Sequence, residues 1–210
     1  MPVVSIDGLP AQVDHFGCLY LHGFLSSPKS QKAQELSRYF DQYLDIHQLS
    51  IPTLPFAPTD AIEVAAKALA ELQAKYARVF IIGSSLGGFY ATWLAQQNNV
   101  PAVLVNPAVR PFELFEHYLG PHTHYYSGEV HQLTTDHLDQ LSRLNVDTVM
   151  HPERLLLLLQ TGDETLDYRH AAQLYRASPA WLESAGSHSF EGFIERLPQI
   201  FHHISRCLQP

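Results

Sequence analysis

Residues 79–88, Val79-Phe80-Ile81-Ile82-Gly83-Ser84-Ser85-Leu86-Gly87-Gly88, contain the most informative pattern in this chain. The apolar run 79–82 predicts a buried strand, and the residues after Gly88 predict a helix. Between them, residues 83–87 match G-x-S-x-G, the pattern of a nucleophile elbow. Such a turn reverses a strand into a helix so abruptly that side chains two positions on either side of the serine would collide. The pattern therefore predicts a strained turn that exposes Ser85 as a nucleophile.

Short apolar runs alternate along the chain with longer segments of helical period, which is typical of a parallel sheet with helices on both faces. The expected strands are Leu19–Leu21, Leu44–Leu49, Val79–Ile82, Ala102–Val105, Leu155–Gln160 and Ala180–Glu183. The expected helices are Ser30–Phe40, Asp60–Tyr76, Leu86–Gln97, Tyr168–Arg176 and Phe190–Cys207. Asp60 is placed to cap the second of these helices. We expect an α/β fold with its six strands ordered 2-1-3-4-5-6.

The interval Pro107–Pro152 interrupts this alternation, because it is far longer than a usual connection between a strand and a helix. Two pieces of it predict helices, the first from the shared face of Phe112, Phe115, Tyr118 and Leu119 and the second from that of Leu138, Leu141 and Leu144. We interpret the interval as a cap inserted over the carboxyl edge of the sheet. The alternative is an excursion with only a structural role.

A serine hydroxyl becomes a nucleophile only when a base takes its proton, and an acid orients that base. In an elbow topology the acid and the base follow the serine on loops after later strands. Asp163 lies three residues past the expected strand 155–160, and His188 lies in the loop after strand 180–183. Asp167 is the competing acid, although its place before a helix also fits a cap. The reserve candidates for the base are His22, His151 and His170.

Donors for a developing oxyanion are expected at two places. The backbone N–H of Leu86 follows the nucleophile at the start of a helix. The loop after the first strand supplies a second N–H, that of Phe24, where Gly23 relieves crowding and His22 and Gly23 are expected to contact the substrate. An ordinary turn is the alternative for His22 and Gly23. Arg110, after the fourth strand, is placed either to meet an anionic group of the substrate or to pair with a nearby glutamate.

Composition excludes several classes of function. The chain has 210 residues and a net charge of −8, with no basic run, so the electrostatic signature of nucleic-acid binding is missing. Its longest aliphatic run is too short to cross a bilayer, and Met1–Leu9 lacks the features of a secretion signal. Cys18 and Cys207 are expected to be free thiols. No cofactor is expected, since a serine, a histidine and an acid carry the chemistry by themselves. No metal is expected, because the cap histidines lack ligand spacing: His117, His122, His124, His131 and His137.

Longer motifs carry a resemblance to a known family. The opening H-G-F-x-S-S-P, the elbow G-S-S-L-G-G-F-Y-A-T-W-L, V-N-P-A-V-R-P-F-E and Q-T-G-D-E-x-L-D-Y-R resemble the YqiA-like esterases of the α/β-hydrolase superfamily from about Leu19 to Phe193. The resemblance implies a compact cytoplasmic esterase that accepts short acyl esters and fatty acyl-CoA thioesters. By similarity, Ser85, Asp163 and His188 match the positions of its catalytic triad.

We therefore expect a single α/β-hydrolase domain over residues 1–210 that cleaves carboxylic esters or acyl-CoA thioesters through an acyl-enzyme intermediate. Its partners would be small-molecule substrates only. An acyltransferase or a peptidase would use the same triad, and a non-catalytic binding module is the alternative outside enzymology. The oligomeric state and the physiological ester do not follow from the residues.

Overall fold

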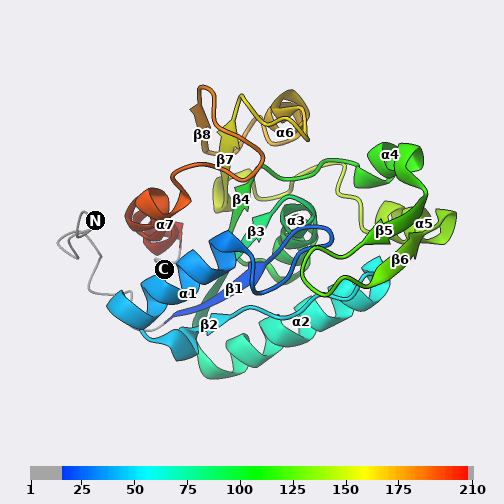
Figure 1. The fold of residues 1–210 in the computed structure, drawn as a ribbon. Helices are drawn as coiled ribbons and strands as arrows, with labels where there is room; N and C mark the ends of the chain where they lie inside the picture. The colour runs from blue at the N-terminus through cyan, green and yellow to red at the C-terminus, as the bar shows by residue number, and fades with distance from the viewer. Residues whose placement is uncertain (1–15, 208–210) are drawn as a thin grey trace.

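The computed structural model describes residues 16–207, and its centre is a six-stranded parallel sheet in the order β2-β1-β3-β4-β7-β8 (Figure 1). A separate two-stranded antiparallel sheet pairs β5 with β6. The strands are β1 (Phe16–Leu21), β2 (Leu49–Ser50), β3 (Arg78–Ser84), β4 (Ala102–Val105), β5 (Gly120–Thr123), β6 (Val130–Leu133), β7 (Leu155–Gln160) and β8 (Ala180–Glu183). The helices are α1 (Gln31–Tyr43), α2 (Pro58–Lys75), α3 (Leu86–Asn98), α4 (Pro111–Phe115), α5 (Thr135–Arg143), α6 (Tyr168–Leu174) and α7 (Phe193–Cys207).

The predicted fold class is confirmed, and so is the predicted strand order, since β7 and β8 are the fifth and sixth strands of the main sheet. The prediction of a strand over Leu44–Leu49 is wrong. That segment follows α1 directly and contains a 3₁₀ turn, Ile46–Gln48, whose start Asp45 caps by accepting the N–H of His47. Only two residues of β2 then pair with β1, because the 3₁₀ turn that Asp45 caps extends up to Leu49. The expectation for Met1–Leu9 lies outside the described residues.

Alternation along the strands builds two apolar layers. Phe16, Cys18 and Tyr20 of β1 face α1 and α7, whereas Leu19 and Leu21 face α2 and α3 on the other side of the sheet. Strands β3, β4 and β7 are buried on both faces, which explains why they read as continuous apolar runs rather than as alternating ones. The sheet is thereby held rigid beneath the loops at its carboxyl edge.

Helix α2 begins earlier than predicted. Its first residue is Pro58 and the residue before it is Ala57, so Asp60 lies in the first turn and does not cap the helix. Proline suits this first position because its missing N–H would have no partner in the helix and its φ angle is already helical. The carboxylate of Asp60 still lies at the end of the helix that favours negative charge.

The interval after β4 does form an insertion, and Figure 1 shows α4, the β5–β6 hairpin and α5 gathered to one side of the main sheet. The predicted second helix exists as α5, with Leu138 and Leu141 buried. The predicted single helical face through Leu119 is wrong, because α4 ends at Phe115 and a 3₁₀ turn, Glu116–Tyr118, leads into the hairpin. The hairpin itself was not predicted, since its strands are polar and mostly exposed.

Two further properties concern the described part of the chain. Among residues 16–207, no helix is both long and apolar enough to cross a bilayer. Cys18 is buried and Cys207 is half-buried, and both are free thiols.

Candidate active site

Ser85 occupies a strained backbone corner between β3 and α3. Its φ and ψ angles are 57° and −122°, a combination that non-glycine residues rarely adopt. A side chain at Gly83 would strike the backbone of Gly87, and one at Gly87 would strike the carbonyl of Leu21. Both glycines are therefore required by the close approach of strand and helix, as the elbow pattern predicts.

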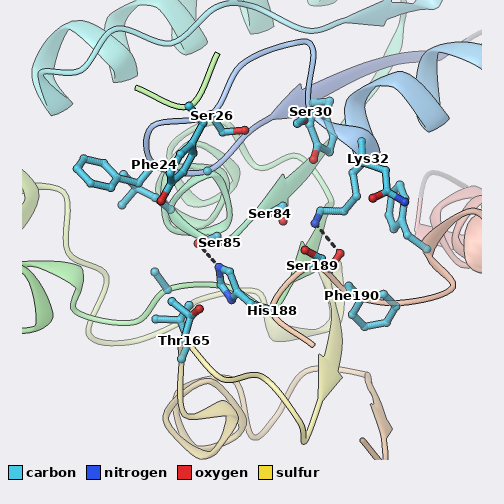
Figure 2. Close-up of a pocket in the computed structure, with 18 of the residues that line it drawn as sticks. Phe24, Ser26, Ser30, Lys32, Ser84, Ser85, Thr165, His188, Ser189 and Phe190 are labelled. Atoms are coloured by element: carbon cyan, nitrogen blue, oxygen red, sulfur yellow. Dashed lines mark hydrogen bonds between the residues drawn. The ribbon is translucent and has the colours of Figure 1, made fainter. Parts of the chain in front are cut away.

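The folded chain brings Ser85, His188 and Asp163 into one hydrogen-bonded row. The Nε2 atom of His188 lies 2.9 Å from Oγ of Ser85, and its Nδ1 atom lies 2.8 Å from Oδ2 of Asp163 (Figure 2 shows the bond to Ser85). The acid is almost fully buried, with 2% of its side chain exposed, whereas 22% of the His188 side chain is exposed. The imidazole is thus anchored on its inner side and accessible on its outer side.

Asp163 is held as a carboxylate despite its burial. Burial by itself raises the pKa of Asp163, but the hydrogen bond from His188 and those from the N–H groups of Leu166 and Thr165 outweigh it and lower the pKa below its usual range. Asp167, the competing acid, instead accepts the N–H of Arg169 and pairs with its guanidinium at 2.7 Å. The Asp167 carboxylate therefore caps α6, and the geometry favours Asp163 as the partner of His188.

The other charged candidates lie outside this row. His151 lies 3.5 Å from Glu153 with half of its side chain exposed. Arg110 pairs with Glu113 at 2.6 Å and with Asp147 at 3.2 Å, and it does not line the cavity that contains Ser85. The expectation that Arg110 meets the substrate is thus not supported, and its alternative, pairing with Glu113, is what the structure contains. His170, in the first turns of α6, lies outside that cavity too.

The loop after β1 lies directly against the candidate nucleophile. A Cβ atom on Gly23 would stand 3.2 Å from Cβ of Ser85, so only glycine lets the loop approach this closely without displacing the serine. Leu86 opens α3, where its N–H has no acceptor within the helix. Phe24 and Leu86 both line the cavity that contains Ser85. This arrangement suits the two predicted oxyanion donors, since both residues lie at the same cavity as the serine.

His22 lines the smaller of two cavities beside Ser85, and both of its ring nitrogens lie within hydrogen-bonding distance of backbone groups of the protein. It is 3% exposed, its Nε2 atom accepts the N–H of Leu54, and its Nδ1 atom lies 3.1 Å from the carbonyl of Gly23. Burial lowers the pKa of His22, which favours the neutral imidazole that these two bonds require. The ring ties the loop of residues 53–54 to the loop that carries Gly23 and Phe24.

Two cavities meet at this loop. The larger, of about 690 Å³, contains Ser85 and His188 and extends between α1, the cap and the start of α7. The smaller, of about 230 Å³, lies behind Phe24 against Leu54 and Phe56. Both share Gly23, Phe24 and Leu86, so the two spaces adjoin on the side of the predicted oxyanion donors. A volume of this size suits a small organic substrate.

Two buried amides that were not singled out from the sequence hold the loop that carries His188. Gln160 is 3% exposed; its Oε1 atom accepts the N–H groups of Ser187 and Glu191, and its Nε2 group donates to the carbonyl of Glu191 and to Glu183. Asn106 is equally buried and donates to the carbonyl of Ser187. The sequence does contain a signal for both amides, because each is a polar residue at the end of an apolar run.

The cap hairpin holds the oxyanion loop from the opposite side. His124 accepts the N–H of Ser127 at Nδ1, so its Nε2 carries the proton and donates to the carbonyl of Ser26 at 2.9 Å. The N–H of Tyr125 donates to the carbonyl of Leu25, a non-glycine residue with a φ angle of 54°. The Phe24 ring packs on Phe115 of α4 at 4.7 Å between centroids. The cap therefore touches the loop through backbone and side chain alike.

The described histidines of the cap do not form a metal centre. Within residues 16–207, no three His, Cys, Asp or Glu side chains gather closely enough to hold a metal ion. His131 stacks on Phe56 with 4.6 Å between ring centroids, and the Nδ1 atom of His137 accepts the N–H of Thr134. These rings serve packing and turn formation in the cap.

A family model described as Uncharacterised protein family (UPF0227) matches residues 17–205, which is nearly the whole of the described chain. The chain belongs to this family. It is the family of the YqiA-like proteins, so the resemblance seen in the sequence motifs is confirmed.

Solved structures share the fold of this UPF0227 member at low identity. A protein of Agrobacterium vitis S4 that was assigned to the hydrolases is 22% identical, with a TM-score of 0.68 over 93% of this chain and 90% of its own. Est1E from Butyrivibrio proteoclasticus is 10% identical, with a TM-score of 0.66 over 93% and 89% of the two chains. Mouse alpha/beta hydrolase domain-containing protein 10 is 14% identical, with a TM-score of 0.65 over 92% and 90%. The fold is therefore that of the α/β hydrolases.

Proposed function

We propose that this protein is a serine hydrolase that cleaves carboxylic esters, thioesters included, through Ser85, His188 and Asp163. The observation that carries the proposal is the row of two hydrogen bonds, 2.9 Å and 2.8 Å long, that joins these three side chains across 103 and 25 residues of sequence. Since the serine also lies in a strained elbow, the arrangement matches what covalent catalysis by a hydroxyl requires. The esterases among the structures of the same fold add support.

In the first half of the proposed reaction, Oγ of Ser85 attacks the carbonyl carbon of the ester while its proton passes to Nε2 of His188. Asp163 accepts the Nδ1–H bond and stabilises the imidazolium that forms. The carbonyl oxygen becomes an oxyanion that the N–H groups of Phe24 and Leu86 bind. His188 then gives its proton to the leaving alkoxide or thiolate, and an acyl-serine remains.

In the second half, water attacks the acyl-serine and passes a proton to His188. Collapse of the second tetrahedral intermediate returns that proton to Ser85 and releases a carboxylic acid. His188 accepts and returns each proton that is transferred in this cycle. The proposed reaction therefore requires no cofactor. A single domain over residues 1–210 and the cytoplasmic location implied by the family resemblance are part of the same proposal.

The experiment is a panel of p-nitrophenyl esters of graded acyl length, with acyl-CoA thioesters alongside, measured on the wild-type protein and on Ser85→Ala. The exposed Ser142 on α5 offers the matched control, Ser142→Ala. Loss of a triad serine reduced kcat by about 10⁶ in subtilisin, and we expect a fall of several orders of magnitude here. A fluorophosphonate probe should label the wild-type protein and Ser142→Ala only.

Two results would change the conclusion. Ester turnover by Ser85→Ala within tenfold of wild type would refute the mechanism. Transfer of the acyl group to an added alcohol or amine in preference to water would make the protein an acyltransferase that uses the same triad.

A further inference from the structure

The wall of the larger cavity that α1 forms is polar, which is unusual beside a site expected to take acyl groups. Lys32, in the first turn of α1, lines this wall and directs its ammonium group toward Ser189, next to His188 in the chain (Figure 2). Its Nζ atom donates to the carbonyl of Ser189 at 2.7 Å. Among the described residues that line the cavity, Lys32 is the only lysine or arginine.

The ammonium group of Lys32 lacks an anionic partner. Among residues 16–207, no carboxylate oxygen lies within 4.0 Å of its Nζ atom. Burial lowers the pKa of Lys32 to about 8, and the more distant charges of Glu35 and Asp163 offset this only in part. Charged groups that are removed from water are normally paired, because desolvation of an isolated charge is costly. An anionic group of a bound molecule would therefore supply the charge that Lys32 lacks.

A second observation points to an anion at the same place. Ser30 is the residue that precedes α1, yet its side chain does not cap the helix. Its Oγ atom is buried and makes no hydrogen bond of good geometry with the described residues, although it lies close to the hydroxyl of Tyr20. Burial raises the pKa of Tyr20, so the Tyr20 hydroxyl is neutral and able to donate to the Ser30 oxygen, which leaves the proton of Ser30 for another acceptor. Helix α1 has 13 residues and no acidic residue in its first turn, so the unpaired N–H groups of that turn also favour an anion.

We propose that Lys32, the Ser30 hydroxyl and the start of α1 form a subsite for a carboxylate carried by the ester substrate. This inference rests on the proposed hydrolase function and adds the class of ester. A carboxylate fits better than a phosphate dianion, because Lys32 supplies one positive charge while Glu35, Glu191 and Glu195 line the same cavity and repel each further negative charge. The carboxylate belongs to the end of the substrate that is remote from the scissile bond, so the substrate is a half-ester or an ester of a carboxylated alcohol.

The test compares matched esters on the wild-type protein, on Lys32→Met and on Lys32→Arg. On the acyl side, the mono-p-nitrophenyl esters of adipic and pimelic acid are set against p-nitrophenyl hexanoate and heptanoate. On the alcohol side, 4-butanoyloxybenzoate is set against its methyl ester. The exposed Lys29, which does not line the cavity, gives the control Lys29→Met with the same change of net charge.

We expect the wild-type protein to prefer the carboxylated member of at least one pair in kcat/KM by about tenfold to a hundredfold, the range of a charged hydrogen bond. Lys32→Met should abolish the preference, whereas Lys32→Arg and Lys29→Met should retain it. The pair that shows the preference tells which side of the ester carries the carboxylate. An equal loss on charged and neutral esters in Lys32→Met would mean that Lys32 only holds Ser189, and would overturn the inference.

A pH series adds a readout that a structural role would not move. The charges of Glu35 and Asp163 act on Lys32, and the other titratable groups that line the same cavity are Tyr20, His188, Glu191 and Glu195. The ratio of the two kcat/KM values cancels the titration of His188, which acts on both esters. Because the ammonium loses its proton above its pKa of about 8, the preference should be full below that pH and decline above it. A ratio that stays constant from pH 6 to pH 10 would refute the subsite.

The two proposals fail in different ways. Absence of turnover with every ester, together with no fluorophosphonate labelling of Ser85, would refute the hydrolase itself. Turnover of the neutral esters without any preference for a carboxylate would leave the hydrolase intact and refute the subsite alone.

Discussion

Replacing Gln160 with leucine tests whether the loop that carries His188 needs its buried amide. The substitution keeps most of the side-chain volume but removes an acceptor from the N–H groups of Ser187 and Glu191, and a donor from Glu183 and from the Glu191 carbonyl. Each buried polar group left unpaired costs about 1–3 kcal/mol. The loop borders the cavity and water can reach part of it, so we expect the free energy of unfolding to fall by about 2 kcal/mol.

The effect on turnover should exceed the effect on folding. The lost bonds flank His188 on both sides, and a misplacement of about 1 Å in a catalytic group costs about 10² in rate. We therefore expect kcat on a neutral p-nitrophenyl ester to fall by about two orders of magnitude. The KM value should stay near that of the wild-type protein, because Gln160 does not line the cavity.

The assay is steady-state hydrolysis at 20 °C, with urea unfolding followed by circular dichroism on the same preparations. Gln173→Leu, which changes an exposed glutamine on α6, is the control and should leave both quantities unchanged. A folded Gln160→Leu protein whose kcat lies within threefold of wild type would refute the idea that this amide positions the histidine.

Further predictions concern the triad acid, acid stability, the cap and the core. Asp163→Asn should lower kcat by about 10⁴, as the equivalent change does in a serine protease. Asp167→Asn should leave kcat near that of the wild-type protein, because asparagine caps a helix about as well as aspartate; the reverse order in ester assays would transfer the acid role to Asp167. Because the pKa of Asp163 is lowered on folding, the stabilisation from its carboxylate is present above the unfolded pKa and is lost as the pH falls through the folded pKa. The urea midpoints of the wild-type protein and Asp163→Asn should therefore converge as the pH falls below the usual range of an aspartate. A constant gap between the two midpoints would contradict this. His124→Ala should weaken inhibition by a trifluoromethyl ketone about tenfold, because one neutral hydrogen bond that holds the oxyanion loop is lost. His124→Gln should restore part of the inhibition. Equal inhibition of all three proteins would show that the cap does not act on the loop. Phe201→Ala should lower the free energy of unfolding by about 3–5 kcal/mol, because the fully buried ring of Phe201 packs against four aromatic rings. A decrease of the thermal midpoint by less than 3 °C would contradict this prediction.

The residues near the elbow were the most predictable part of the site. A glycine pair around a serine between an apolar run and a helix is a local pattern, so it is readable without the rest of the molecule. The chain order of acid and histidine follows from the same topology. Arg110 was less predictable, because its partner Asp147 is 37 residues away and only the folded cap brings the two together.

The polar contacts around the site could not be found from the sequence. Lys32 and Ser30 look like ordinary residues at the start of a helix, and Gln160 looks like the polar end of an apolar strand. Their roles depend on what lies beside them from distant segments, such as Ser189 beside Lys32. The hairpin β5–β6 was missed for a related reason, since two short exposed strands carry no apolar alternation.

Local physical chemistry, acting over a few neighbouring residues, was sufficient to predict most strands and helices of this protein and the turn that presents Ser85. Those features depend on apolar periodicity and on steric limits of the backbone, which neighbouring residues express among themselves. Only the tertiary structure decided which acid meets His188, which groups hold its loop and which ammonium lines the cavity beside Ser189. Such matters depend on distances between groups far apart in the chain and on the loss of water around them, and both arise only when the sheet, the cap and α7 pack together.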